Sequence, residues 1–156
     1  MRLADILTLD LVKVPLVAVD KKAAITELVD LLFNNHLVKD RDMVLASVLE
    51  REATRTTGVG HGLAIPHSKC GGVNRLVMAV GKPAQPMDFQ AIDGQPVFII
   101  CLLVSPPDQT AAHIQALAKL SRLMINDTFR AKLKATQNPA EVFGTIMDQD
   151  KTSVPT

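Results

Sequence analysis

The longest apolar run of the chain is Val97-Phe98-Ile99-Ile100-Cys101-Leu102-Leu103-Val104. A strand with one solvent-facing side alternates apolar and polar residues, and this run has no alternation. It therefore predicts a strand that is buried on both faces, at the centre of a covered sheet. The run is far shorter than the roughly 20 apolar residues that span a membrane as a helix, so we expect no membrane insertion.

Helical periodicity precedes this run. Asp20 stands before apolar residues spaced i, i+3, i+4 and i+7, which predicts a helix capped by Asp20 and reaching about Asn34. A second helix is predicted from Asp40 or Asp42 to about Glu52. Between these helices and the apolar run, residues 56–62 predict a glycine-rich loop, and residues 63–65 and 76–80 predict short strands.

Helical periodicity also follows the run. A helix capped by Asp108 or Thr110 is expected, with one shared face formed by Ile114, Leu117, Ala118, Ser121, Met124 and Ile125. Asp127 is expected to cap a short helix through Leu133, and Asn138-Pro139 to open the last helix. We predict one α/β (α+β) domain over residues 1–150, with a mixed β-sheet flanked by helices. A loose tail is expected from about Asp150, over residues 151–156.

The composition argues against nucleic-acid binding, and the start of the chain argues against export. The 156 residues include 17 basic and 16 acidic side chains, five Phe, and neither Trp nor Tyr. Charges so nearly balanced, without aromatic stacking platforms, disfavour nucleic-acid binding. The start of the chain has no export signal that we can identify, so we expect a cytoplasmic protein with reduced thiols at Cys70 and Cys101.

Residues 53–87 contain no Asp or Glu but include Arg55, Lys69, Arg75 and Lys82. This local excess of cations indicates an anion site, although a chance gap in composition explains it equally well. The glycines at 58, 60 and 62 match neither nucleotide-binding glycine pattern. If phosphate is bound in this region, we expect it to arrive on another protein.

Two histidines are candidates for chemistry. His67 follows Pro66 directly, which suits an exposed and rigidly aimed nucleophile; the alternative is a loop histidine with no task. His113 lies in the first turn of a predicted helix, where an anion is favoured; the alternative is a surface histidine. Weaker alternatives are a zinc site from His61, His67, Cys70 and Cys101, and a Cys70–His67 nucleophilic pair.

The segment Arg51-Glu52-Ala53-Thr54-Arg55-Thr56-Thr57-Gly58-Val59-Gly60-His61-Gly62-Leu63-Ala64-Ile65-Pro66-His67 resembles the phosphorylation-site segment of phosphotransferase-system enzyme IIA proteins of the fructose/mannitol type. Asp108-Gln109-Thr110-x-x-His113 resembles the second histidine region of that family. Ser68 departs from the pattern, because the family usually has Gly, Ala or Cys there. The resemblance covers essentially the whole chain and implies the enzyme IIA fold.

The resemblance also implies roles. His67 would accept a phosphoryl group on Nε2 from an HPr-like phosphocarrier, with His113 and Arg51 stabilising the phosphate and with no metal or cofactor. The chain looks most like the stand-alone nitrogen-regulatory IIA proteins, whose phosphorylation state controls a target protein. The alternatives are a fructose/mannitol transport component that passes phosphate to a IIB cysteine, and a binding module that has lost the transferase chemistry, for which Ser68 is the only support.

Overall fold

The computed structural model describes residues 1–153, and its central strand is β6 (Ile99–Ser105). Every residue of β6 is buried, as the unbroken apolar run predicts. The strand begins two positions later than the run and continues through Ser105, a polar residue with no solvent exposure.

The strands form one mixed sheet in the order β1-β5-β6-β3-β2, with β4 also paired to β6. The pairs β1–β5, β3–β6 and β4–β6 are parallel, whereas β5–β6 and β2–β3 are antiparallel. The other strands are β1 (Val12–Leu16), β2 (Gly58–Gly60), β3 (Leu63–Ala64), β4 (His67–Lys69) and β5 (Val77–Pro83). The prediction of a mixed sheet is therefore confirmed.

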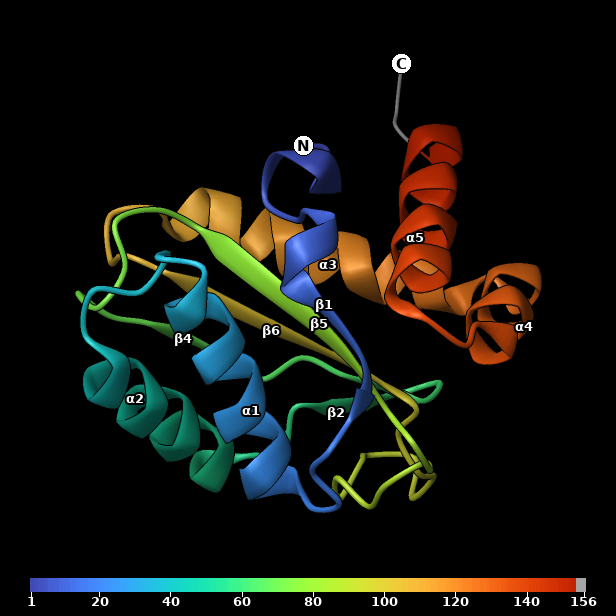
Figure 1. Cartoon of the computed structure of the whole chain (residues 1–156), viewed down its shortest axis with the longest axis horizontal. Coiled ribbons are helices and arrows are strands. Elements are labelled where there is room, and N and C mark those ends of the chain that lie inside the picture. Colours follow the sequence, from blue (N-terminus) through green and yellow to red (C-terminus); the bar gives the residue numbers. More distant parts are fainter. Residues whose placement is uncertain (154–156) are drawn as a thin grey trace.

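Helices cover both faces of the sheet. Figure 1 shows α1 and α2 packed side by side on one face, while α3 crosses the other face and α4 and α5 follow it. The helices are α1 (Lys21–Asn34), α2 (Arg41–Thr54), α3 (Thr110–Ile125), α4 (Asp127–Ala135) and α5 (Pro139–Ser153). Two short 3-10 helices, Leu3–Asp5 and Leu9–Leu11, precede β1. No helix among residues 1–153 is both long and apolar enough to cross a membrane.

Side-chain caps explain where most helices begin. Asp20 and Asp40 accept hydrogen bonds from the backbone N–H groups of Ala23 and Met43, at 2.9 and 3.1 Å. Asn138 caps α5 in the same way, by accepting from the Glu141 N–H. Two predicted caps are wrong. Asn126, not Asp127, caps α4, and Gln109 occupies the cap position of α3 without a side-chain hydrogen bond.

The short elements depart most from the sequence predictions. The sequence predicts neither β1 nor β4, and β2 lies inside the expected loop 56–62. His67 is consequently the first residue of a strand, not of a loop. These three strands are three to five residues long, and pairing with neighbouring strands forms them, so local periodicity gives no sign of them.

The buried face of α3 is not the predicted one. Ile114 and Ile125 are 58% and 64% exposed, although the predicted face includes both. The buried side chains are His113, Ala116, Lys119, Leu120, Leu123 and Met124. A polar histidine and a lysine occupy this face because both find partners inside the protein.

The expected loose tail does not begin at Asp150. Helix α5 continues through Ser153, and Asp150 is 2% exposed. Its carboxylate oxygens lie 2.7 Å from the Lys119 Nζ and 2.8 Å from the Leu3 N–H. The remainder of the predicted tail, residues 154–156, lies outside the described residues.

Candidate functional site

A cleft of about 520 Å³ opens between α2, β4 and α3. The structure brings His67, His113 and Arg51 together here, and all three line the cleft. The other lining residues are Ser47, Glu50, Thr54, Ser68, Lys69, Ile114 and Leu117. The two histidine rings meet edge to face, with their centroids 5.5 Å apart.

Strand β6 explains why residues so distant in sequence meet. Strand β4 pairs with β6 in parallel, so that His67 lies beside Leu103 and Lys69 beside Ser105. The same strand leads through a short turn into α3, whose first turn carries His113. One buried strand thus positions both histidines, the first by pairing and the second by chain connection.

The hydrogen bond of His67 defines its tautomer. Its Nδ1 lies 2.7 Å from the Ile65 carbonyl oxygen. A carbonyl oxygen only accepts hydrogen bonds, so Nδ1 carries the proton and donates it. The neutral ring therefore keeps its free lone pair on Nε2, which is the nitrogen available as a nucleophile.

His113 is held by a hydroxyl group. Its Nδ1 lies 2.7 Å from the Ser105 Oγ, and both residues are buried. When the hydroxyl donates this bond, the proton of the neutral imidazole lies on Nε2 and can be donated to an anion. The sequence analysis missed Ser105; the only signal was a polar residue directly after the apolar run.

The surroundings of both histidines favour the neutral form of their rings. Burial lowers the pKa of His67, and the positive charges of Arg51 and Lys69 lower it further, against the hydrogen bond to Ile65 and the charge of Glu52. Burial also lowers the pKa of His113, to about 4, with contributions from His67 and Lys69. A cleft that holds two neutral imidazoles beside two cations favours an anionic group between them.

The structure assigns a contact to Ser68, the residue that departs from the family pattern. Ser68 is buried, and its hydroxyl is hydrogen-bonded to the hydroxyl of Ser47 on α2. The pair ties β4 to α2 directly beside His67. This contact gives Ser68 a structural task, which weakens its use as a sign of lost chemistry.

Glu52 has a role that the sequence analysis did not foresee. The residue is 6% exposed, and its carboxylate lies 2.9 Å from the Lys21 Nζ. It also accepts hydrogen bonds from the N–H and the hydroxyl of Thr57. Glu52 therefore anchors the start of the segment that leads through β2 and β3 to His67.

The structure separates other residues that the sequence placed together. Of the cations in residues 53–87, Lys69 lines the cleft, whereas Lys82 lines a different cavity, together with His61. Among residues 1–153, no three or more His, Cys, Asp or Glu side chains are grouped to hold a metal ion. Cys70 and Cys101 are both free thiols, and burial raises the pKa of Cys101 to about 12.

An NMR titration can test the protonation states of His67 and His113. We expect the His67 ring to titrate below its ordinary value of 6.5 and to carry its proton on Nδ1 when neutral. We expect His113 to titrate near 4. Long-range ¹H–¹⁵N spectra of the imidazole rings measure both properties. Arg51→Gln provides the comparison, because loss of this charge should raise the pKa of His67 without moving its proton from Nδ1.

The lowered pKa values of the two histidines also determine how the stability of the protein changes with pH. Both folded-state pKa values lie below the unfolded value of 6.5, so between these limits the unfolded chain binds more protons. The two histidines should therefore reduce the free energy of unfolding as the pH falls from 6.5 towards 4. A titration of either ring above 6.5 would contradict this account of the cleft.

Comparison with known proteins identifies the family. The model of the family "Phosphoenolpyruvate-dependent sugar phosphotransferase system, EIIA 2" matches residues 5–149. The PTS system fructose-specific EIIA component of Haloferax volcanii is 34% identical over 140 residues, covering 90% of this chain and 91% of that protein. The nitrogen regulatory protein of Escherichia coli is 34% identical over 135 residues, covering 85% and 81%.

A solved structure supports the same grouping. Nitrogen regulatory protein IIA-Ntr from Neisseria meningitidis is 28% identical with a TM-score of 0.85, and the match covers 92% of this chain and 98% of that one. Some relatives are much longer: this chain spans 24% of the fructose-specific EIIABC component of Bacillus subtilis. The family match over residues 5–149 and the similarity of fold lead to one conclusion: the chain belongs to the type-2 enzyme IIA family of the phosphoenolpyruvate-dependent sugar phosphotransferase system.

Proposed function

We propose that this protein is a cytoplasmic phosphohistidine carrier that accepts a phosphoryl group on His67 Nε2 from an HPr-like phosphocarrier. The observation that carries the proposal is the hydrogen bond from His67 Nδ1 to the Ile65 carbonyl, in a ring whose pKa is lowered. It leaves Nε2 unprotonated at neutral pH and holds the ring at a fixed angle. A nucleophile so placed needs no general base before it attacks.

The reaction is an in-line phosphoryl transfer between two histidines. The lone pair of His67 Nε2 forms the new N–P bond while the N–P bond of the donor phosphohistidine breaks, and the bonding electrons return to the donor ring. The transferred group carries its charge on three oxygens, so catalysis consists of positioning and positive charge. Arg51 would supply positive charge, and the Nε2–H of the neutral His113 ring would donate a hydrogen bond to the phosphoryl oxygens.

The test of the carrier role is phosphorylation by phosphoenolpyruvate, enzyme I and an HPr-like carrier. Acid-labile addition of one phosphoryl group supports the proposal, and folded protein that gains none beside an active donor refutes it. That second result would favour a binding module that retains the fold without the chemistry.

We further propose that the phosphorylation state controls a target protein, as the name of the nitrogen regulatory relatives suggests. The second candidate is a transport component that passes phosphate to a IIB cysteine, favoured by the fructose-specific relative. Pull-downs with phosphorylated and unphosphorylated protein distinguish them. Different partners in the two states support regulation, whereas identical partners together with transfer to a cognate IIB domain support transport.

Ser105 should control the rate of transfer through His113. Without its hydroxyl, nothing among the described contacts keeps the His113 proton on Nε2, where it can donate to the phosphoryl oxygens. We expect Ser105→Ala to slow phosphorylation of His67 by about tenfold, the effect of one lost charge-assisted hydrogen bond. Phosphorylation reactions that are stopped at successive times measure the rate.

The control for this variant is a change in tautomer, which a packing defect would not produce. In Ser105→Ala, the ¹⁵N spectrum of His113 should show an increased population with the proton on Nδ1. Ser105→Thr, which retains the hydroxyl, should restore the Nε2–H form. An unchanged rate together with an unchanged tautomer would remove Ser105 from the mechanism.

A further inference from the structure

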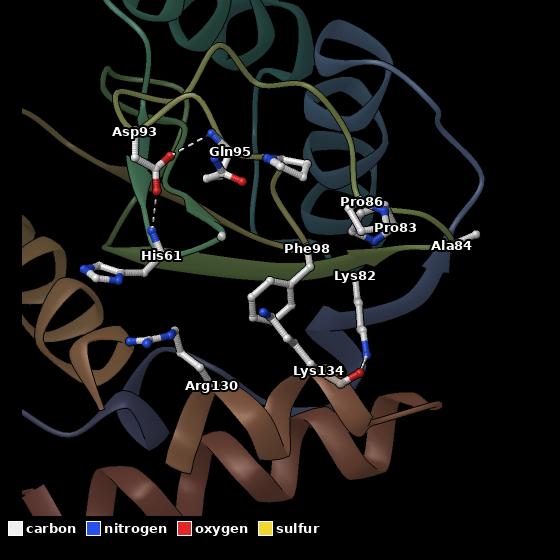
Figure 2. Close-up of a pocket in the computed structure, with 12 residues that line it drawn as sticks. His61, Lys82, Pro83, Ala84, Pro86, Asp93, Gln95, Phe98, Arg130 and Lys134 are labelled. Atoms are coloured by element: carbon white, nitrogen blue, oxygen red, sulfur yellow. Dashed lines mark hydrogen bonds between the residues drawn. The ribbon is translucent and has the colours of Figure 1, made fainter. Parts of the chain in front are cut away.

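A second cavity of about 610 Å³ lies apart from the histidine cleft and shares none of its lining residues. Figure 2 shows its walls: the turn before β3 with His61, the segment between β5 and β6, and α4 with Arg130 and Lys134. Its volume falls within the range of small-molecule sites, about 300–1,000 Å³. The proposed phosphoryl transfer at His67 makes no use of this cavity.

Two cations on one face of α4 border this cavity. Arg130 and Lys134 are four residues apart, so their side chains lie on the same side of the helix. Arg130 donates to the Met124 carbonyl and to Asp127, which uses two of its five N–H groups. The Lys134 ammonium takes part in none of the described ion pairs, and its described contact is the Phe98 ring, whose centroid lies 5.2 Å away.

 The N–H groups that these contacts leave free on Arg130 and Lys134 are therefore available to an anion.

Lys82, the third basic side chain of the cavity beside Arg130 and Lys134, has no free donor for a ligand. The Lys82 Nζ lies 2.7 and 2.5 Å from the carbonyl oxygens of Lys134 and Thr136, and it also contacts the Leu133 carbonyl. These bonds use its three protons to hold the C-terminal end of α4 against β5. Lys82 contributes positive charge to the cavity, while Arg130 and Lys134 contribute the free donors.

The opposite wall carries an acceptor. The two carboxylate oxygens of Asp93 accept hydrogen bonds from the backbone N–H groups of Gln95 and His61, at 3.0 and 3.1 Å. These bonds lower the pKa of Asp93, with the one from Gln95 contributing most. The ionised carboxylate retains lone pairs for a ligand hydroxyl, and it repels a second negative charge on that side. The Phe98 ring and the prolines at 83, 86 and 96 supply apolar surface between the two walls.

We propose that this cavity binds a small hydroxylated phosphomonoester, with its phosphate on Arg130 and Lys134 and a hydroxyl group on Asp93. A phosphate ester carries a charge close to −2 at neutral pH and three acceptor oxygens, which match two neighbouring cations. A dicarboxylate would place its second charge against Asp93. The proposal is independent of the phosphorylation of His67.

The test is a ¹H–¹⁵N NMR titration of the whole protein. The probes are glucose 6-phosphate and glycerol 3-phosphate, with glucose and glutarate as comparisons. We expect the two phosphomonoesters to shift the resonances of His61, Asp93 and Lys134, and to bind at least about tenfold more tightly than glucose or glutarate. The same titration of His67→Ala should give unchanged affinities, which separates this site from the proposed phosphoryl acceptor.

A matched pair of variants tests the specific contact. Lys134→Gln should weaken phosphomonoester binding by about tenfold, whereas Lys132→Gln removes the same charge from an exposed position of α4 outside the cavity and should change binding by less than about twofold. Equal losses in both variants, equal binding of glutarate, or no shift with either phosphomonoester at roughly 10 mM would each overturn the proposal.

Discussion

Replacement of His67 by alanine abolishes acid-labile phosphorylation while the protein remains folded; this is the largest effect we expect. The variant loses the only group that the proposed reaction modifies, so the loss should be complete rather than a slower rate. His67 is half-buried, and its described contacts are one hydrogen bond and the edge of the His113 ring, so its removal leaves the core intact. Intact mass before and after acid treatment measures the bound phosphoryl group.

His113→Ala is the matched comparison for this variant. It removes the neighbouring ring of the same cleft but not the proposed acceptor. We expect His67 to remain phosphorylated, at a rate reduced by about 10²-fold, as when one donor to a developing charge is lost. Complete loss in His113→Ala with retained labelling in His67→Ala would show that the two roles are reversed.

The second large effect concerns stability. Lys119 on α3 is 5% exposed; its Nζ pairs with Asp150 of α5 at 2.7 Å and donates to the Met1 carbonyl. Lys119→Met leaves the buried Asp150 carboxylate without this cation. We expect the free energy of unfolding to fall by about 3–5 kcal/mol, the usual cost of removing one partner of a buried ion pair. Urea denaturation measures it.

Two variants identify the cause of this loss. In Lys119→Met combined with Asp150→Asn, both charges of the pair are removed together, and an amide oxygen can still accept from the Leu3 N–H. This double variant should recover more than half of the lost stability. Lys132→Met, on the exposed side of α4, should change it by less than about 0.5 kcal/mol. A loss below about 1 kcal/mol in Lys119→Met would contradict a structural role for the pair.

The sequence predicts the long elements well because their signals are local. The apolar run 97–104 identifies the buried strand, and Asp20, Asp40 and Asn138 mark helix starts through bonds that reach three residues along the chain. The predicted face of α3 fails for the complementary reason. Periodicity records which side chains are apolar, whereas Lys119 and His113 are buried because Asp150 and Ser105 reach them from other elements.

The candidate site shows the same difference between what local sequence patterns predict and what tertiary contacts decide. The sequence by itself determined the family, through the segment 51–67, and with it the three residues His67, His113 and Arg51 as candidates. Only the tertiary structure decided that they share a cleft, that Ile65 holds the proton on His67 Nδ1, and that Ser105 meets His113. Sheet pairing creates these contacts between segments far apart in the chain, and no local pattern of residue types specifies such pairing.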